Sequence, residues 1–439
     1  MTLPPRLGHN SLNEYLLCFV HIPKTAGSSF TNVLITLIGQ DKFRVLLPDI
    51  LQGFKKVDFD INSYNGISGH FPYEISKLIS KPILLLTFLR DPVSRSLSHY
   101  KQLQRMNLDD PWIHKSKNYR FYKQLHQMSF SDFIEHPFFR IEVANLQTRM
   151  LGLLIEHPIR QLRDVMPMDK SSDRSFSVEL AKERLEEFSF LGLQEKFRES
   201  MELFSYQFGT YPIMNPPTVN ISSDKIQFTT LSESVIEKLF LLNKLDFELY
   251  EFGQKLFTNR YDEMLGALRK EYKYREVKNT HLHELLSIEF YKNNEIMDFP
   301  YRYEFDEIYE RSGWYLVEQV NEKIWAWSGP GTTSTIDLPF SRANYLRIRF
   351  QIMHFIEPDV LESLELHIDD QRIHLIHTQE NGVHIFAGII PCDPEKKYTC
   401  TKLSFHVNRT AYPPDMSTDS PGARLLGIAL SWIEISLIK

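Results

Sequence analysis

The sequence has 439 residues, of which 42% are hydrophobic and 24% are charged, and its formal net charge is -6. This length and composition are typical of an ordinary soluble globular protein with two or three domains. The negative net charge argues against a general nucleic-acid-binding protein, although a local basic groove for an anionic ligand is compatible with it.

The chain shows no recognisable membrane or export segment. No stretch reaches the roughly 18 uninterrupted apolar residues that a membrane span needs, and residues 1–13 lack the apolar core and cleavage site of a signal peptide. The three cysteines, Cys18, Cys392 and Cys400, form no disulfide framework, and free thiols are favoured over a Cys392–Cys400 bridge. We therefore expect a soluble, cytoplasmic protein.

Residues 15–38 predict a strand, a tight turn and a helix. Residues 15–20 form a short apolar run with β-branched and aromatic side chains, which is typical of a buried strand. Pro23 and Gly27 then break the run, and apolar residues continue at helical spacing to Ile38. The backbone N–H groups at such a helix start are unpaired and lie at the positive end of the helix dipole, so the turn can hold an anion.

Polar side chains gather at this turn and would add charge and hydrogen-bond donors: Lys24, Thr25, Ser28 and Ser29. The pattern therefore predicts a phosphate or sulfate site, although an ordinary strand–helix turn with a surface lysine has the same outline. It is not a Walker A loop, because the lysine precedes the single glycine and the spacing G-x-x-x-x-G-K-[ST] is absent.

Residues 21–29, His-Ile-Pro-Lys-Thr-Ala-Gly-Ser-Ser, resemble the 5′-phosphosulfate loop of membrane-type carbohydrate sulfotransferases. That group includes the heparan sulfate 2-O- and 6-O-sulfotransferases and bacterial relatives, whose donor is 3′-phosphoadenosine-5′-phosphosulfate (PAPS). The resemblance implies a P-loop-like α/β fold, with a parallel sheet flanked by helices. Eukaryotic members carry a Golgi signal anchor, so its absence here suggests a bacterial, cytoplasmic member. The implied donor-binding residues in the loop are Lys24, Thr25, Ala26, Gly27, Ser28 and Ser29.

Residues 64–71 are punctuated by glycine and predict a second strand that ends at His70. A lone histidine after a strand is more often structural than catalytic. In the resembling sulfotransferases, however, a histidine at the end of this strand is the proposed general base, and His70 matches that position. The resemblance therefore implies that His70 is catalytic and contacts the acceptor.

Residues 83–89 form an apolar run that suits a strand buried on both faces of a parallel sheet. Asp91 is placed to cap the next helix and Pro92 to begin it. Arg90 then lies at the carboxyl end of the strand, where open α/β sheets bind ligands. The string that begins at Arg90 resembles the 3′-phosphate-binding motif of sulfotransferases, R-D-P-x-x-R-x-x-S-x-Y, at every fixed position. The resemblance implies that Arg90 and Ser98 bind the 3′-phosphate of PAPS.

Asn145, Gln147 and Arg149 resemble an N-x-Q-x-R segment that family members place beside donor and acceptor. The resemblance implies that Arg149 contacts the donor and that Asn145 and Gln147 contact the acceptor. Residues 102–136 are polar and aromatic, and we expect helices and loops over the active site where acceptor specificity could lie.

The next segments predict a strand at 188–193 and one long amphipathic helix at 232–257, with a capping box formed by Ser234 and Glu237. We expect a PAPS-dependent sulfotransferase domain over residues 14–259 and a charged helical linker over 260–298. His281, His283 and Glu284 in the linker predict no metal site, because alternate residues of one helix face apart.

Beyond Pro300 the hydrophobic period changes to two residues. Alternating segments at 346–352, 364–368, 403–407 and 428–435 predict a β-sandwich domain over residues 299–439. The segment with Trp314, Trp325 and Trp327 resembles modules appended to bacterial polysaccharide-modifying proteins, which makes this a candidate glycan-binding domain. The tryptophans could stack on sugars or pack in the sandwich core, and the sequence favours neither.

The motifs together predict a sulfotransferase that moves a sulfuryl group from PAPS to a carbohydrate hydroxyl by in-line displacement. His70 would act as the base, and Lys24 would stabilise charge on the leaving phosphate. No metal is predicted, and the expected partner is a glycan and not a nucleic acid.

Two other functions are compatible with parts of this pattern. A nucleotide kinase or NTPase would need the missing Walker A spacing and a metal-binding aspartate after a strand. A glycan-binding protein with an inactive sulfotransferase-like domain is disfavoured by the presence of Lys24, His70, Arg90 and Ser98. The oligomeric state and the acceptor sugar are not predicted.

Overall fold

The computed structural model describes most of the chain, namely residues 4, 6–7, 12, 14–46, 60–108, 114, 119–155, 175–212, 231–273, 279–293, 299–305, 311–315, 317–321, 323–338, 340–380, 382–394, 401–413 and 424–438. The chain divides into two compact units. The first consists mainly of Ser11–Gln207 and Pro217–Lys273, and the second mainly of Tyr274–Lys439. Cys400 lies outside the described residues, whereas Cys18 is a buried free thiol.

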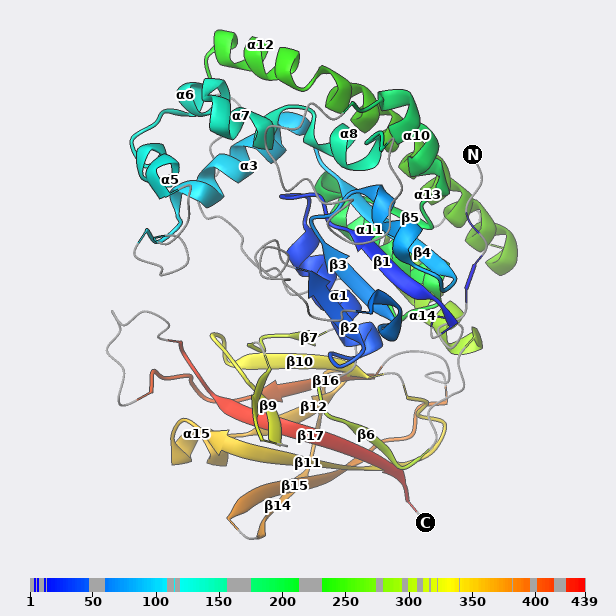
Figure 1. Cartoon of the computed structure of the whole chain (residues 1–439). Coiled ribbons are helices and arrows are strands. Elements are labelled where there is room, and N and C mark those ends of the chain that lie inside the picture. The colour runs from blue at the N-terminus through cyan, green and yellow to red at the C-terminus, as the bar shows by residue number, and fades with distance from the viewer. Residues whose placement is uncertain are drawn as a thin grey trace. The chain divides into compact units, whose positions relative to one another are not determined.

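The first unit is built on a five-stranded sheet in the order β2-β3-β1-β4-β5 (Figure 1). All neighbouring strands are parallel, so their carboxyl ends lie at one edge, where Val20 of β1 pairs with both Gly69 of β3 and Thr87 of β4. The strands are β1 (Leu16–Val20), β2 (Phe43–Leu46), β3 (Gly66–Gly69), β4 (Ile83–Leu89) and β5 (Phe190–Leu193).

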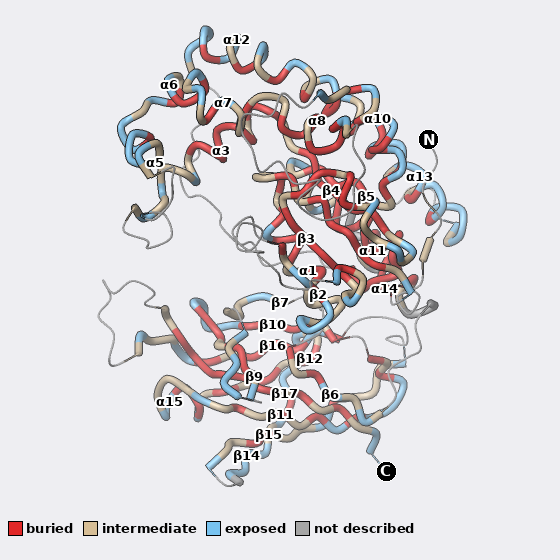
Figure 2. The backbone as a smooth tube through the Cα atoms, viewed as in Figure 1, coloured by how far each residue is buried: buried red, intermediate tan, exposed pale blue. Residues whose placement is uncertain are grey.

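Helices flank this sheet, and Figure 2 shows that the most buried backbone of the unit runs through the strands. The helices are α1 (Gly27–Ile38), α3 (Pro92–Gln104), α5 (Tyr119–Leu125), α6 (Phe130–Glu135), α7 (Pro137–Val143), α8 (Leu146–Leu151), α10 (Val178–Glu187), α11 (Phe197–Phe208), α12 (Glu233–Leu242) and α13 (Lys244–Tyr272), with short 3-10 helices η2 (Ile61–Ser63), η3 (Tyr73–Leu78) and η4 (Gln194–Lys196). The predicted α/β fold class is therefore confirmed.

Three local predictions were wrong. The strand before His70 ends one residue earlier, at Gly69. The single helix predicted over 232–257 is two helices that meet at Asn243, whose side chain bonds the carbonyl of Leu239. Helix α12 begins at Glu233 after the N-cap Ser232, so the predicted capping box does not form.

Helices α8 and α13 cap each other at their first turns. The Asp246 carboxylate of α13 accepts hydrogen bonds from the N–H groups of Gln147 and Thr148, at 3.1 and 2.7 Å. In return, the Asn145 side chain before α8 accepts from the N–H groups of Leu245 and Asp246, at 3.0 and 3.2 Å. Each helix therefore supplies the acceptor that satisfies the unpaired donors of the other.

Further along α13, the buried Arg260 donates to the carbonyl groups of Glu186 and Phe188, both at 3.0 Å. The Glu186 carbonyl is in the last turn of α10, and the Phe188 carbonyl lies between α10 and β5. The same helix is therefore tied to the α8 segment at its start and to the segment before β5 farther on. Helix α13 is continuous across residues 259 and 260, where the sequence places the end of the domain.

The second unit contains α14 (Asn279–Asn293) and a β-sandwich. One sheet has the order β13-β12-β16-β10-β7, and the other has the order β14-β15-β11-β17-β9-β8, with β6 paired to β17. The strands are β6 (Tyr301–Tyr303), β7 (Arg311–Ser312), β8 (Glu318–Val320), β9 (Lys323–Trp327), β10 (Thr333–Leu338), β11 (Leu346–Phe355), β12 (Glu365–Ile368), β13 (Gln371–Ile373), β14 (Leu375–Glu380), β15 (Val383–Ile390), β16 (Thr401–His406) and β17 (Ile428–Leu437), and α15 is Pro358–Glu362.

The two sheets of the sandwich share one hydrophobic core. Phe350 of β11 meets Phe405 of β16 edge to face across that core, with ring centroids 5.3 Å apart. Trp314 packs against it from the edge and donates its indole N–H to Thr335 O. The predicted all-β domain is therefore confirmed. Among the described residues, no helix is long and apolar enough to cross a membrane.

The mutual capping of α8 and α13 generates a stability prediction. Replacing Asp246 by alanine leaves two buried N–H groups without acceptors and removes a buried carboxylate that interacts with the buried Arg95, so we expect a loss of about 3–5 kcal/mol. Urea unfolding followed by helical circular dichroism measures it, because the first unit holds most of the described helix. Asp262→Ala, at an exposed position of the same helix, should change stability by less than about 0.5 kcal/mol. Equal midpoints for the two variants would contradict the role of Asp246.

Candidate active site

The turn after β1 forms an uncapped helix start. Lys24 and Ala26 have left-handed backbones, with φ of 72° and 70°, and α1 begins at Gly27 without a side-chain cap. The first backbone bond of the helix runs from the Phe30 N–H to Ala26 O. Within the described residues, the N–H groups of Gly27 and Ser28 therefore have no backbone acceptor. Alternating backbone conformations at a helix start create a concave, anion-binding surface.

The hydroxyl groups of this turn differ in their surroundings. Thr25 is fully buried and donates to Ile22 O at 2.8 Å, so its side chain fixes the turn from within. Ser28 is exposed, whereas Ser29 is 8% exposed. Donor binding by Thr25, Ser28 and Ser29 stays a prediction, and for Thr25 the backbone is the part that remains available.

Arg90 connects the end of β4 to this turn. Its guanidinium donates to Lys24 O at 3.0 Å and lies 3.9 Å from the Glu195 carboxylate. Its backbone is held on both sides by the fully buried Gln147, whose amide oxygen accepts from Arg90 N–H and whose amide nitrogen donates to Arg90 O, at 3.0 and 2.8 Å. Arg90 and Lys24, which are 66 residues apart in sequence, therefore form one fixed unit.

Positive charge is concentrated around this unit. Burial lowers the pKa of Lys24 below its ordinary value, and the charges of Arg90 and Arg105 lower it further. Burial also lowers the pKa of Arg90 and of Arg149. These cations repel one another, and a ligand with two anionic groups would relieve that repulsion.

Two histidines meet beside the turn. His21 follows β1 and His70 follows β3, and their ring centroids are 4.6 Å apart at an interplanar angle of 70°. The His21 ring stacks on Phe19 and lies so close to Gly27 that a Cβ atom there would be 1.9 Å from the ring. Gly27 is therefore required for the turn to pass His21, and His21 fixes one side of His70.

The histidines are held neutral by their surroundings. Burial lowers the pKa of His21 well below its ordinary range, and the charges of His70 and Lys24 add to this effect. Burial also lowers the pKa of His70, Glu142 opposes this shift, and Lys24 reinforces it. Glu142 also lies 3.8 Å from the ring of His99, measured from carboxylate oxygen to Nε2. A neutral histidine can accept a proton, as a base must.

The N-x-Q-x-R residues all bond other parts of the protein. Asn145 caps α13, Gln147 holds the Arg90 backbone, and Arg149 donates to Ile141 O at 2.6 Å. Arg95 of the neighbouring motif is fully buried and donates to the carbonyls of Glu142 and Val143. These contacts support the walls of the site. Direct contact of Asn145, Gln147 and Arg149 with donor or acceptor stays a prediction.

Ser98 lies on α3 and is half-buried, and its hydroxyl has no hydrogen-bond partner among the described residues. Because it follows the capped start of α3 at Asp91, it is carried by the same strand–helix unit as Arg90. Its side chain is therefore available to a ligand. No group of three or more acidic, histidine or cysteine residues that could hold a metal occurs in the described part of the chain.

The sequence prediction overlooked His21, Glu142 and Arg105. His21 could have been predicted as a site residue. It directly follows β1, His70 directly follows β3, and the carboxyl ends of paired parallel strands lie side by side. Glu142 and Arg105 could not have been predicted, because neither belongs to a recognisable sequence motif. They come close to the site only through the packing of α7 and of the end of α3.

The chain is similar to one protein family and to several named proteins. A family model described as "Sulfotransferase family" matches residues 12–253. A heparan-sulfate 6-O-sulfotransferase 2 from Gallus gallus is 26% identical over 320 residues, covering 64% of this chain and 78% of that protein. A heparan-sulfate 6-O-sulfotransferase 3-B from Danio rerio is 24% identical over 296 residues, covering 60% of this chain and 68% of that protein. A heparan-sulfate 6-O-sulfotransferase 1 from Homo sapiens is 23% identical, covering 58% and 69%.

Among solved structures, a family GH115 4-O-methyl-α-glucuronidase aligns with 90% of this chain and 58% of its own, at 10% identity. Its TM-score of 0.19 is too low for any conclusion about fold.

The charges around His70 generate a prediction with two opposite signs. Lys24→Met removes a cation and should raise the pKa of His70, whereas Glu142→Gln removes an anion and should lower it further. NMR titration of the histidine ring protons measures both shifts. The pKa of His384, which is in the second unit, is the internal control and should not move. Shifts of the same sign in both variants would show that Lys24 and Glu142 do not act through charge.

Proposed function

Because the chain belongs to the sulfotransferase family, we propose that it transfers a sulfuryl group from PAPS to a hydroxyl group of a glycan. Sulfuryl transfer to carbohydrate is the activity in the names of its relatives. The observation that carries the proposal for this chain is the bond between Arg90 and Lys24 O, which joins two cationic positions into one site. PAPS carries anionic groups at two positions of one nucleotide, and a donor with a single phosphate would use only half of the site.

For the donor, we propose that the uncapped start of α1 and Lys24 hold the 5′-phosphosulfate. Arg90 and Ser98 would hold the 3′-phosphate, with Arg90 supplying charge-assisted hydrogen bonds. Gln147 would contribute indirectly, because it fixes the backbone that carries the Arg90 side chain.

The reaction follows from these positions. The neutral His70 takes the proton of the acceptor hydroxyl as its oxygen attacks sulfur. The bond between sulfur and the bridging phosphate oxygen breaks on the opposite side, and adenosine 3′,5′-bisphosphate leaves with the bonding electrons. Lys24 and the N–H groups of the turn stabilise the negative charge that grows on that oxygen. His21 keeps the His70 ring in place from the other side.

For the acceptor, we propose a glycan chain of the heparan type, in which uronic acid and hexosamine residues alternate. The support is the acceptor in the names of the relatives. The direct test is incubation of the chain with PAPS and an unsulfated chain of this type, followed by detection of sulfate on the glycan.

The donor site generates a binding prediction. Arg90→Ala removes a charge-assisted contact and should weaken the binding of adenosine 3′,5′-bisphosphate by about 1.5–3 kcal/mol. Titration calorimetry on folded protein measures it. Arg269→Ala removes the same charge at an exposed position of α13 and should leave the affinity unchanged. If the Arg90 variant binds adenosine 3′,5′-bisphosphate with wild-type affinity, Arg90 does not contribute to the donor site.

The base generates a kinetic prediction. His70→Ala should transfer sulfate about 10²–10⁴-fold more slowly and still bind adenosine 3′,5′-bisphosphate, because other residues hold the donor. In the wild type, kcat/KM should fall as the pH drops through the His70 pKa, because only the neutral ring accepts a proton. Burial lowers that pKa, so this fall should occur below pH 6.5, the ordinary value.

The acidic fall should disappear in His70→Ala. Lys24→Ala provides the contrast, because it should slow transfer at every pH near neutrality while the fall remains. A His70→Ala variant that keeps more than about a tenth of wild-type turnover would exclude His70 as the base.

A further inference from the structure

The larger sheet of the sandwich has an outer face with aromatic residues. Ala326 of β9 lies in the core, so its alternating neighbours Lys323, Trp325 and Trp327 lie on the opposite, outer face. The neighbouring strand β17 contributes the small Ala429 between them, which pairs with Trp327 on one side and with His354 of β11 on the other. A small residue between large ones leaves a hollow in the sheet surface.

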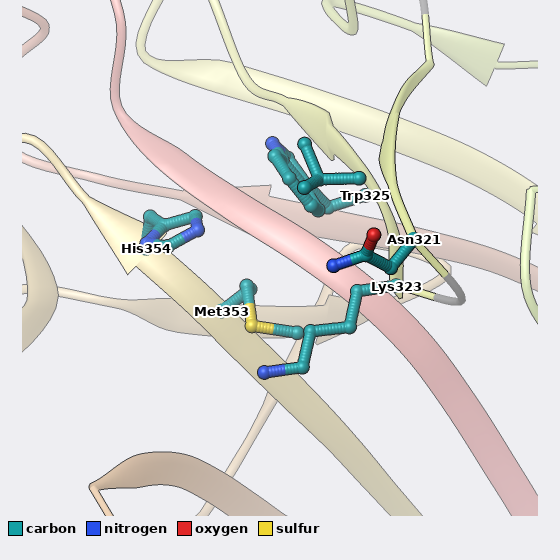
Figure 3. A pocket seen from close by; sticks show the side chains of 6 residues that line it. Asn321, Lys323, Trp325, Met353 and His354 are labelled. Carbon is teal, nitrogen blue, oxygen red and sulfur yellow. The ribbon is translucent and has the colours of Figure 1, made fainter.

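That hollow is an open pocket of about 670 Å³, within the range of carbohydrate-sized ligands. Figure 3 shows side chains from the β8–β9 hairpin and from β11 around it, with Lys323 and Met353 on one side and Trp325 and His354 on the other. Its lining residues are Val320, Asn321, Lys323, Trp325, Met353 and His354.

A second hollow of about 210 Å³ continues from the first, because Lys323 and Met353 line both. Trp432 lies in this second hollow, and the Arg302 guanidinium stacks over its ring at 4.4 Å. The pairing of β11 with β17 is irregular here and skips Met353 and Ser431, which both line the second hollow. Such irregularities redirect side chains, and they are common at binding sites.

The polar groups of this surface indicate the chemistry of its ligand. The acidic residues around it already have arginine partners: Glu318 with Arg424, Glu304 with Arg302, and Glu434 with Arg349. Lys323, in contrast, has no acidic partner among the described residues. The indole N–H of Trp325, a residue that is 8% exposed, has no hydrogen-bond partner in the described structure.

Sugar rings present apolar C–H faces and hydroxyl groups, which match aromatic rings and unpartnered donors. The charge of Lys323, which has no acidic partner among the described residues, matches a carboxylate. A neutral glycan would leave that charge unused, and an apolar peptide would also leave the Trp325 N–H unpaired.

We propose that these two hollows form a glycan-binding groove, separate from the catalytic site, for a uronic-acid-containing stretch of the acceptor chain. The choice of acceptor rests on the proposed function, whereas the groove itself rests on the second unit alone. The uronate carboxylate contacts Lys323, and neighbouring sugars contact Trp325 and Trp432. Such a groove retains a long acceptor between transfer events without taking part in the chemistry.

The test uses the full chain and an unsulfated hexasaccharide of alternating glucuronic acid and N-acetylglucosamine, titrated by calorimetry. Lys323→Gln should weaken binding about tenfold. The matched control is Lys402→Gln, an exposed lysine on β16 of the other sheet, and it should bind as the wild type does. A carboxyl-reduced hexasaccharide should bind the wild type as weakly as the intact sugar binds Lys323→Gln.

Three results would each overturn the groove: no binding of the hexasaccharide to the wild type, equal affinity of the two lysine variants, or equal affinity for the carboxyl-reduced sugar. The same samples are titrated with adenosine 3′,5′-bisphosphate, which should bind the wild type and Lys323→Gln equally. If the wild type does not bind the nucleotide, this result contradicts the sulfotransferase proposal and not the groove. In transfer assays, Lys323→Gln should raise KM for long chains, with kcat and the KM for a disaccharide unchanged.

Discussion

The site depends on one exchange of hydrogen bonds between two helix starts. Asp246 of α13 caps α8, and Asn145 before α8 caps α13, so neither helix can shift without leaving the other with buried, unpaired N–H groups. The first turn of α8 carries Gln147, and Gln147 fixes the backbone of Arg90. The position of the Arg90 cation is therefore determined by hydrogen bonds within the protein that run from Asp246 through Gln147 to the Arg90 backbone.

The sheet topology brings the remaining groups to the same edge. In the order β2-β3-β1-β4-β5, β1 is followed in the chain by strands on one side of it and β4 by a strand on the other side, and open α/β sheets bind ligands at the carboxyl ends of such a strand pair. Lys24 follows β1 and Arg90 follows β4, and their hydrogen bond joins the ends of these two strands. His70 follows β3, on the far side of β1 from Arg90, so the proposed base and the proposed 3′-phosphate site lie on opposite sides of β1.

Much of this could be predicted from sequence where the signal is local. The apolar run of β4, the cap at Asp91 and the turn at Lys24 each fix their own backbone, and all three appear as predicted. The break at Asn243 was missed because hydrophobic spacing continues across it, and only the partner Asn145, about 100 residues away, shows why the helix restarts there. Likewise, the motif residue Gln147 is recognisable in sequence, but its bonds to the Arg90 backbone are visible only once α8 is placed. The positions of the tryptophans on the outer face of the sandwich could not be predicted from the sequence. Alternation along a strand separates its side chains into two faces, but it does not show which of them the second sheet covers.

Helix α13 has a consequence for how the molecule moves. Its first turn is bound to α8, and Arg260 donates hydrogen bonds to the carbonyl groups of Glu186, at the end of α10, and Phe188, which precedes β5. Helix α13 thus connects α8, which positions Arg90, to the segment before the edge strand β5. Local unfolding of α8 would therefore require α13 to lose its contacts at both places. We therefore expect the amide hydrogens of α8 to exchange with solvent only in the rare openings that also expose β5, which would place the candidate site in the slowest-opening part of its unit.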